Sequence, residues 1–135
     1  VIGRNQLKRL DKNIVKRNEN LKLFLNSLDS RKYRTDFNTE GCSNYAFTLI
    51  LKNKDDKLAH RVMETLDVIN VEYRRGTSGG GNQLRQPYLK QLVGEDFHKN
   101  FPETEHIHFF GFYIGNYPCL ESQKIERLCH ILNEL

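Results

Sequence analysis

Apolar residues recur at helical spacing near both ends of the chain. From about residue 4 to residue 29 they stand three, four or seven positions apart, which predicts a long amphipathic helix. The members of this stripe are Leu7, Leu10, Ile14, Leu21, Phe24 and Leu28. A second stripe near the C-terminus predicts a closing helix and consists of Ile125, Leu128, Leu132 and Leu135. The polar residues 31–43 are expected to form a loop.

Three apolar runs between these helices predict β-strands, at residues 45–51, 68–73 and 110–114. The first run is apolar on both faces, as a strand covered on both sides would be. One helix is expected to begin after the cap residues Asn53 to Asp56 and to end at about Asp67. A short helix is expected over 88–92 after Pro87, and one or two helical turns are expected over 103–109. The order is α-β-α-β-loop-α-β-α. We therefore predict an α+β fold, a two-layer α/β sandwich whose small, mostly antiparallel sheet has about three strands packed with helices.

Length and composition restrict the class of protein. The chain has 135 residues, which suits one domain, and 38% of them are hydrophobic, too many for a disordered chain. No apolar run approaches the roughly 20 residues that cross a membrane. The first residues do not resemble a signal peptide and the chain does not begin with Met. We expect either a processed start or a piece of a longer protein, located in the cytoplasm.

The three cysteines, Cys42, Cys119 and Cys129, are an odd number at wide spacing without a CxxC pair. This pattern favours free thiols in a reducing compartment, with a single disulfide as the alternative. The net charge of +4 is concentrated at the start, where residues 1–34 hold ten Lys and Arg against three Asp and Glu. These charges surround the first helix and do not form one strip, so we expect a solvated helix and no nucleic acid partner.

The segment 74–87 combines four glycines with Arg74, Arg75 and Arg85 and has no hydrophobic period. Glycines let backbone N–H groups approach a phosphate closely, and arginines add bidentate, charge-assisted contacts. The spacing matches neither a Walker A loop nor a GxGxxG motif. Anion binding is the favoured interpretation, and a flexible surface loop is the alternative.

No catalytic or metal-binding pattern is recognisable in this sequence. His106 and His108 stand two apart and would share one face of a strand, but no third metal ligand follows at a suitable spacing. A structural or substrate-contacting histidine is the favoured interpretation for both. The remaining histidines, His60, His98 and His130, are expected at the surface or beside helices. Neither a nucleophile with its base nor a lysine in an apolar neighbourhood is evident.

Three blocks of sequence carry a family resemblance. They are residues 2–11 with Arg17, residues 73–88 with Gly81-Asn82 and Arg85-Gln86-Pro87, and residues 104–118 with Gly115-Asn116-Tyr117-Pro118. These blocks resemble the C-terminal small domain of the DegT/DnrJ/EryC1/StrS family, vitamin-B6-dependent enzymes that act on nucleotide-linked sugars. The last two blocks resemble the 3-dehydrase branch, which removes the 3-hydroxyl of a 4-keto-6-deoxyhexose on a nucleoside diphosphate. Asn44 stands where that branch usually has Trp.

The resemblance implies that residues 1–135 form a single C-terminal small domain whose large cofactor-binding domain is absent. It implies pyridoxal or pyridoxamine 5'-phosphate in the full-length enzyme and no cofactor on this fragment alone, which we expect to be inactive. The implied partners are the nucleotide-sugar substrate, the upstream large domain and a second copy in a homodimer when full length, with no membrane. A sugar aminotransferase of the same family is one alternative. A free-standing module that binds nucleotide or RNA phosphates is another.

The resemblance also implies which residues contact the substrate. Arg74 and Arg85 are expected to contact the diphosphate or the sugar. Ser78, Asn82 and Gln86 are expected to hydrogen-bond sugar hydroxyls, while His108, Asn116 and Tyr117 would line the mouth of the site. For Asn116 and Tyr117, a plain turn before the closing helix is the alternative. No catalytic, cofactor-binding or metal-binding residue is expected within this chain.

Overall fold

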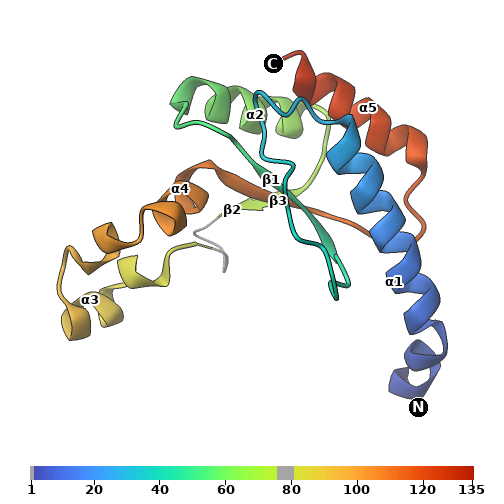
Figure 1. Ribbon diagram of the computed structural model, residues 1–135, viewed down its shortest axis with the longest axis horizontal. Helices are drawn as coiled ribbons and strands as arrows, with labels where there is room; N and C mark the ends of the chain where they lie inside the picture. The colour runs from blue at the N-terminus through green and yellow to red at the C-terminus, as the bar shows by residue number, and fades with distance from the viewer. Residues whose placement is uncertain (1, 76–80) are drawn as a thin grey trace. The chain divides into compact units, whose positions relative to one another are not determined.

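The computed structural model describes residues 2–75 and 81–135 (Figure 1). The chain divides into two compact units. The terminal unit comprises Val1–Phe47 and Gly115–Leu135, and the middle unit comprises Thr48–Ile114.

Two helices form the terminal unit, α1 at Ile2–Ser27 and α5 at Ser122–Asn133. They pack through the apolar stripes that the sequence predicts, so that Leu21, Phe24, Leu28, Ile125, Leu128 and Leu132 are all buried. The loop after α1 is tied to the end of α5. The Tyr33 hydroxyl donates to the carbonyl oxygen of Leu132 at 2.7 Å, and the Asn133 side chain donates to that of Ser27 at 2.8 Å. Both predicted helices and the predicted loop are confirmed.

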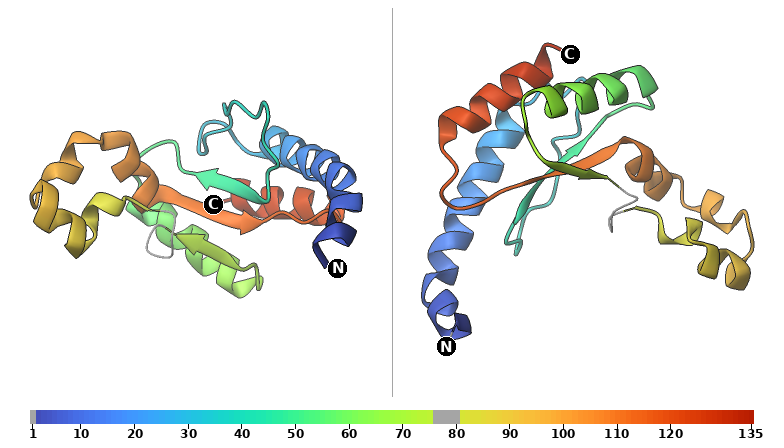
Figure 2. Two further views of the ribbon diagram at one scale, coloured as in Figure 1. Left: turned by 90° about the horizontal axis from the view of Figure 1, so that it is seen from below. Right: turned by 180° about the vertical axis from the view of Figure 1, so that it is seen from behind.

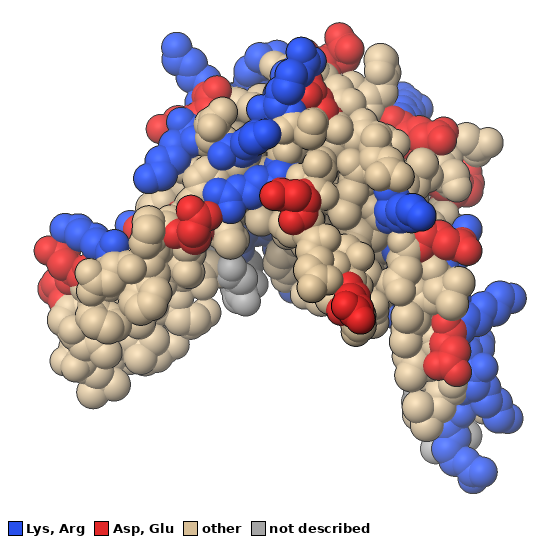
Figure 3. Space-filling model, viewed as in Figure 1, with Lys and Arg blue, Asp and Glu red and all other residues tan. Residues whose placement is uncertain are grey.

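The stripe of α1 is buried only along its C-terminal half. Leu7 is 67% exposed and Leu10 is 42% exposed, although both belong to the predicted apolar face. Lys and Arg side chains project from these N-terminal turns (Figure 3). No helix in the described residues is long and apolar enough to cross a membrane. The packing of α1 therefore comes from its second half.

The three cysteines are free thiols, as the sequence predicts, and all belong to the terminal unit. Cys42 and Cys119 are exposed, whereas Cys129 is buried. The Cys129 Sγ lies 3.6 Å from the carbonyl oxygen of Phe24. Burial raises the pKa of the Cys129 thiol to about 12, because a thiolate would lose its hydration there.

The sheet has three strands in the order β1-β3-β2, which are β1 at Ala46–Ile50, β2 at Tyr73–Arg75 and β3 at Gly111–Gly115 (Figure 2). β2 pairs antiparallel with β3, with Tyr73 opposite Ile114. β1 also runs antiparallel to β3. The Leu51 N–H donates to the Phe110 carbonyl at one end, and the Asn116 N–H donates to the Tyr45 carbonyl at the other. These pairings confirm the predicted α+β class with a small antiparallel sheet.

Helix α2 at Asp56–Val68 belongs to the middle unit, and Asp55 caps it by accepting the Leu58 N–H at 3.0 Å. The predicted second strand exists but begins later than expected, because of residues 68–73 only Tyr73 belongs to β2. Val68 is still helical and Ile69 donates its N–H to the Thr65 carbonyl, after which Asn70 turns the chain with a φ of 53°. The β-branched residues after the helix suggested a strand, but only residues 73–75 pair with β3.

The rest of the middle unit is a series of short helices. These are η2 at Gln83–Arg85, α3 at Pro87–Val93, η3 at Phe97–Asn100 and α4 at Pro102–Phe110. Pro87 and Pro102 both occupy the first turn of a helix, where the missing N–H costs nothing. The predicted helices around 88–92 and 103–109 are confirmed, whereas the expected connection at 96–102 contains η3.

Candidate functional site

Polar residues of the middle unit gather around the carboxylate of Glu105. Arg85 donates from Nε to Glu105 Oε1 at 2.8 Å and from Nη2 to Glu105 Oε2 at 2.5 Å. The Asn82 side chain donates to Oε1 at 2.8 Å. We call Asn82, Arg85, His98, Glu105 and His108 the Glu105 cluster. It brings together three of the residues that the sequence predicts for substrate binding, Asn82, Arg85 and His108.

Local structure explains why these side chains meet. Asn82 caps η2 by accepting the Leu84 N–H at 3.1 Å, and the single 3-10 turn that follows carries Arg85 onto the same side as Asn82. In α4, Glu105 and His108 are three residues apart and share one face of the helix. The cluster therefore forms where one turn of η2 meets one face of α4.

The ion pair sets the electrostatics of the cluster. Hydrogen bonds from Arg85, and to a smaller extent from Asn82, lower the pKa of Glu105 to about 2 against the opposing effect of burial. In return, the Glu105 hydrogen bonds raise the pKa of Arg85. The Arg85 guanidinium carbon also lies 4.7 Å from the centre of the Phe109 ring, within cation–π range. Most of the Arg85 guanidinium is thus already engaged by protein groups.

His108 is held as a neutral imidazole with a defined proton. Its Nδ1 accepts the Asn82 backbone N–H at 3.2 Å, so the remaining ring proton is on Nε2. Burial, followed by the positive charge of Arg85, lowers the pKa of His108. At neutral pH, His108 can therefore offer an Nε2–H donor to a ligand.

Sequence reasoning missed two members of the cluster. The partners of Glu105, Arg85 and Asn82, stand 20 and 23 positions earlier, and no local sequence pattern predicts these contacts. His98 was expected at the surface or beside a helix, and the surface placement is wrong because its side chain is buried. Its Nδ1 lies 3.0 Å from the Glu95 carbonyl oxygen and its Nε2 lies 4.0 Å from Glu105 Oε2.

His106 and His108 lie on opposite sides of helix α4. The two residues were considered on a strand, but in α4 they point about 200° apart around the axis. His106 is buried, and its Nε2 lies 2.6 Å from the Leu51 carbonyl oxygen. This is the structural histidine that the sequence favours. Within residues 2–75 and 81–135, no group of three or more His, Cys, Asp and Glu is placed to hold a metal ion.

The glycine-rich segment is divided between several environments. Arg74 is an exposed residue of β2, opposite Tyr113 in the register. Arg75 instead turns into the middle unit, where it donates to the Phe109 carbonyl and lies 5.1 Å from the Phe112 ring centre. Gln86 is half-buried where α3 begins, and its side chain makes no capping hydrogen bond. Ser78 lies outside the described residues.

Asn116 and Tyr117 belong to the terminal unit and differ in exposure. Asn116 is 2% exposed, and its side chain donates to the carbonyl oxygens of Arg17 and Asn44, both at 2.9 Å. Its Oδ1 accepts from the Asn20 side chain at 3.1 Å. Tyr117 is 54% exposed. Asn116 therefore has protein partners on both sides of its amide, while Tyr117 presents its ring to solvent.

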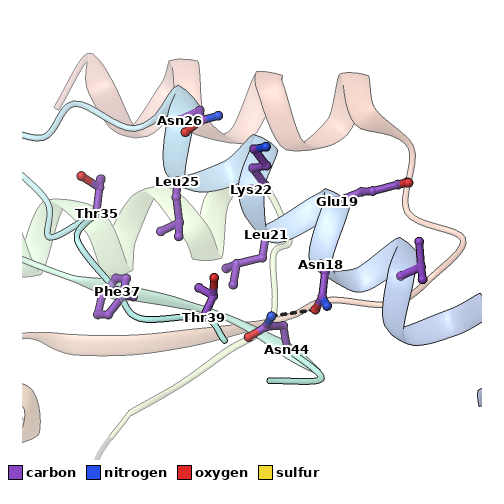
Figure 4. A pocket seen from close by; sticks show the side chains of 11 residues that line it. Asn18, Glu19, Leu21, Lys22, Leu25, Asn26, Thr35, Phe37, Thr39 and Asn44 are labelled. Carbon is purple, nitrogen blue, oxygen red and sulfur yellow. Dashed lines mark hydrogen bonds between the residues drawn. The ribbon is translucent and has the colours of Figure 1, made fainter. Parts of the chain in front are cut away.

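A hollow of about 580 Å³ lies in the terminal unit between α1 and residues 35–44 (Figure 4). Its volume is in the range of small-molecule sites. Leu21 and Leu25 point from α1 toward Phe37 in this view, and Asn44 donates its side-chain amide to Asn18 at 2.8 Å. Among the residues predicted for substrate binding that the structure describes, none lines this hollow.

Comparison with known proteins shows which family the chain matches by sequence. The sequence profile described as DegT/DnrJ/EryC1/StrS aminotransferase family matches residues 1–133. GDP-4-keto-6-deoxy-D-mannose 3-dehydratase of Escherichia coli O55:H7 (strain CB9615 / EPEC) is 25% identical over 132 residues, which cover 97% of this chain and 34% of that protein. The chain therefore spans about a third of the length of this curated relative.

Solved structures of similar enzymes have the same fold over this segment. One is GDP-4-keto-6-deoxymannose-3-dehydratase with a trapped PLP-glutamate geminal diamine, at a TM-score of 0.81 and 25% identity over 97% of this chain and 34% of that one. Another is a variant of GDP-4-keto-6-deoxymannose-3-dehydratase with bound GDP-perosamine, at a TM-score of 0.80, 25% identity and the same coverage. The similarity covers both units of the chain.

Proposed function

The chain belongs to the DegT/DnrJ/EryC1/StrS aminotransferase family, and from this membership we propose that it is the C-terminal small domain of a longer enzyme acting on nucleotide-linked 4-keto-6-deoxy sugars. The observation that carries the proposal is the match of nearly the whole chain, in sequence and fold, to a 3-dehydratase of GDP-4-keto-6-deoxy-D-mannose. The proposed reaction is removal of the 3-hydroxyl during deoxysugar synthesis. The proposed enzyme is a homodimer in the cytoplasm.

The cofactor of the proposed enzyme is pyridoxal or pyridoxamine 5'-phosphate, which supplies an electron sink for the reaction. A similar 3-dehydratase has been solved with hydrated PLP. The described residues do not fit this group, because none of their lysines is buried where it could hold the aldehyde carbon away from water. We therefore assign cofactor binding to a large domain upstream, and no chemical step is assigned to this chain.

The contribution of this chain is to bind and orient the sugar nucleotide. Arg74, exposed on β2, supplies positive charge for the diphosphate, and the Nε2–H of His108 donates to the sugar. Asn82, Arg85 and Gln86 form the polar wall beside them. Contacts of Ser78, Asn116 and Tyr117 with the substrate are proposed from the family resemblance alone. Holding the substrate in one orientation while excluding water favours the reaction at its reacting carbon.

Titration calorimetry with GDP-mannose, a nucleotide-sugar probe, tests the proposal on the chain. Binding is expected, and Arg74→Ala or Arg85→Ala should weaken it by about 1–3 kcal/mol, the usual effect of losing a charge-assisted hydrogen bond. Arg61→Ala is the matched control, since it removes an exposed arginine of α2 in the same unit. An unchanged affinity in Arg85→Ala removes that residue from the site, and no binding by the unsubstituted chain refutes the proposal.

A sugar aminotransferase is the second candidate, because the matching family profile is described as an aminotransferase family. The upstream sequence distinguishes the two reactions. A lysine at the proton-transfer position indicates an aminotransferase, and a histidine indicates a 3-dehydrase. A third titration, with a short RNA at two salt concentrations, tests for a free-standing phosphate-binding module. Salt-dependent RNA binding without GDP-mannose binding would favour that module.

A further inference from the structure

Glu105 is bound by two residues of the proposed sugar-nucleotide site. Its carboxylate accepts four hydrogen bonds, three from Arg85 at 2.8, 3.1 and 2.5 Å and one from Asn82 at 2.8 Å. The side chain of Glu105 is 17% exposed and that of Arg85 is 33% exposed. These contacts are short and partly shielded from water, so they restrain both partners more than a surface ion pair would.

The guanidinium of Arg85 is already arranged as it would be on a phosphate. Its Nε and Nη2 form the parallel fork that recognises two oxygens of one anion, and Glu105 occupies that fork. One face of the group lies over the Phe109 ring. A diphosphate that used the same fork would have to displace Glu105, and the displaced carboxylate would repel it.

The restraint continues from Glu105 to His108 through Asn82. The Asn82 side chain is held by Glu105, its Oδ1 caps η2, and its backbone N–H donates to Nδ1 of His108. This last hydrogen bond keeps the ring proton on Nε2. Glu105 thus determines both the start of η2 and the donor that His108 presents.

From this geometry we propose that Glu105 is a positioning residue of the sugar-nucleotide site, and that Arg85 acts through Glu105 and does not contact the diphosphate directly. The inference rests on the proposed function. It leaves Arg74 as the arginine that meets the diphosphate. The two arginines therefore have different roles, although the sequence predicts the same contacts for both.

Glu105→Gln distinguishes positioning from direct contact by the sign of its effect. The amide still accepts from Asn82 but no longer holds Arg85 by charge, so a positioning role predicts GDP-mannose binding weakened by about five- to tenfold. A direct Arg85–diphosphate contact predicts tighter binding, since a competing negative charge has been removed. Glu64→Gln, which removes an exposed carboxylate of α2, is the control and should change neither affinity nor thermal midpoint.

Salt dependence provides a readout that general destabilisation would not change. Arg74→Ala should reduce the dependence of affinity on salt, whereas the double variant Arg85→Ala with Glu105→Ala, which removes both charges of the pair, should leave it as in the unsubstituted chain. The charge-swapped double variant Arg85→Glu with Glu105→Arg should recover part of the affinity lost in either single variant. It keeps the test decisive if a single variant unfolds.

Nitrogen-15 NMR of the histidine rings completes the test. The unsubstituted chain should show His108 protonated at Nε2, and Glu105→Gln should shift the ring toward a mixture of tautomers. Tighter binding in Glu105→Gln, or an Nδ1-protonated His108 in the unsubstituted chain, overturns the positioning role while the proposed function stands. No GDP-mannose binding by the unsubstituted chain overturns both.

Discussion

The side chain of Asn20 donates a hydrogen bond to the side chain of Asn116 at 3.1 Å, across 96 positions of sequence. Both side chains are buried, at 2% exposure each. Asn116 also donates to the carbonyl oxygens of Arg17 and Asn44. It therefore joins α1 to the two segments that flank the sheet, the entry to β1 and the exit from β3.

Replacing Asn116 should destabilise the protein strongly. Asn116→Leu has a similar volume but removes the donor to the part-buried carbonyl oxygens of Arg17 and Asn44 and leaves the Asn20 amide with only the Tyr117 carbonyl as acceptor. Each buried group left without a partner costs about 1–3 kcal/mol. We expect the free energy of unfolding, measured by urea denaturation, to fall by at least about 2 kcal/mol. Asn18→Ala is the control, because it removes only an exposed amide contact to Asn44 and should cost less than about 0.5 kcal/mol. Equal losses in the two variants would contradict this account of Asn116.

Gly111 stands where a side chain does not fit. A Cβ at this position would lie 2.5 Å from the carbonyl oxygen of Ile107, a backbone atom that cannot turn aside. Gly111→Ala should therefore lower the free energy of unfolding by about 1–3 kcal/mol, the range of overpacking substitutions. At Gly115 the nearest atom to an added Cβ is 3.6 Å away, so Gly115→Ala is the matched control. A thermal midpoint of Gly111→Ala at or above that of the control would refute the steric reason.

The three thiols should differ in reactivity. Cys42 and Cys119 are exposed, whereas burial raises the pKa of Cys129 to about 12. Only the thiolate attacks an alkylating reagent, so Cys129 should remain unmodified at pH 8. Mass spectrometry after iodoacetamide treatment should show two labels on the folded protein and three after denaturation. Three labels on the folded protein would mean that the Cys129 region opens readily.

The Arg85–Glu105 pair should contribute to stability in a defined pH window. The pKa of Glu105 is about 2 in the folded protein against 4.5 for an unperturbed glutamate. Because the folded-state pKa is depressed, the contribution is complete above about pH 4.5 and is lost as the pH falls toward 2. As the pH is lowered from 5 to 2, the free energy of unfolding of Glu105→Gln should therefore decrease less than that of the unsubstituted protein. Urea denaturation of both proteins at each pH measures this difference. Parallel curves for the two proteins would exclude a stabilising pair.

Local signals predicted most helices well, because their causes are within one or two turns of chain. The apolar spacing of α1 and α5, the Asp55 cap of α2 and Pro87 at the start of α3 all act between near neighbours. The second strand was placed too early, at 68–73 and not at Tyr73–Arg75, for the opposite reason. β-branched residues suit either a strand or the end of a helix, and only the pairing partner decides between the two. That partner, β3, lies about 40 residues away.

The candidate site shows the same division between sequence and tertiary structure. The family blocks predicted Asn82, Arg85 and His108, which do come together, but no pattern within the sequence indicated Glu105 or the buried His98. Similarly, His106 and His108 are only two positions apart in the sequence, yet the ring of His106 contacts the Leu51 carbonyl oxygen and that of His108 accepts the Asn82 N–H. Contacts of Asn82, Arg85 and His108 with a sugar nucleotide stay a prediction.

By itself, the sequence determined the main helices, the positions of β1 and β3 and the family. Each of these depends on interactions between near neighbours or on motifs that are contiguous in the chain. Only the tertiary structure decided that Arg85 is neutralised, that Asn116 is enclosed by protein and that the α1 stripe is half exposed. The physical reason is that charge pairing, hydrogen-bond satisfaction and burial depend on distances between atoms, which residues far apart in the chain acquire only when it folds.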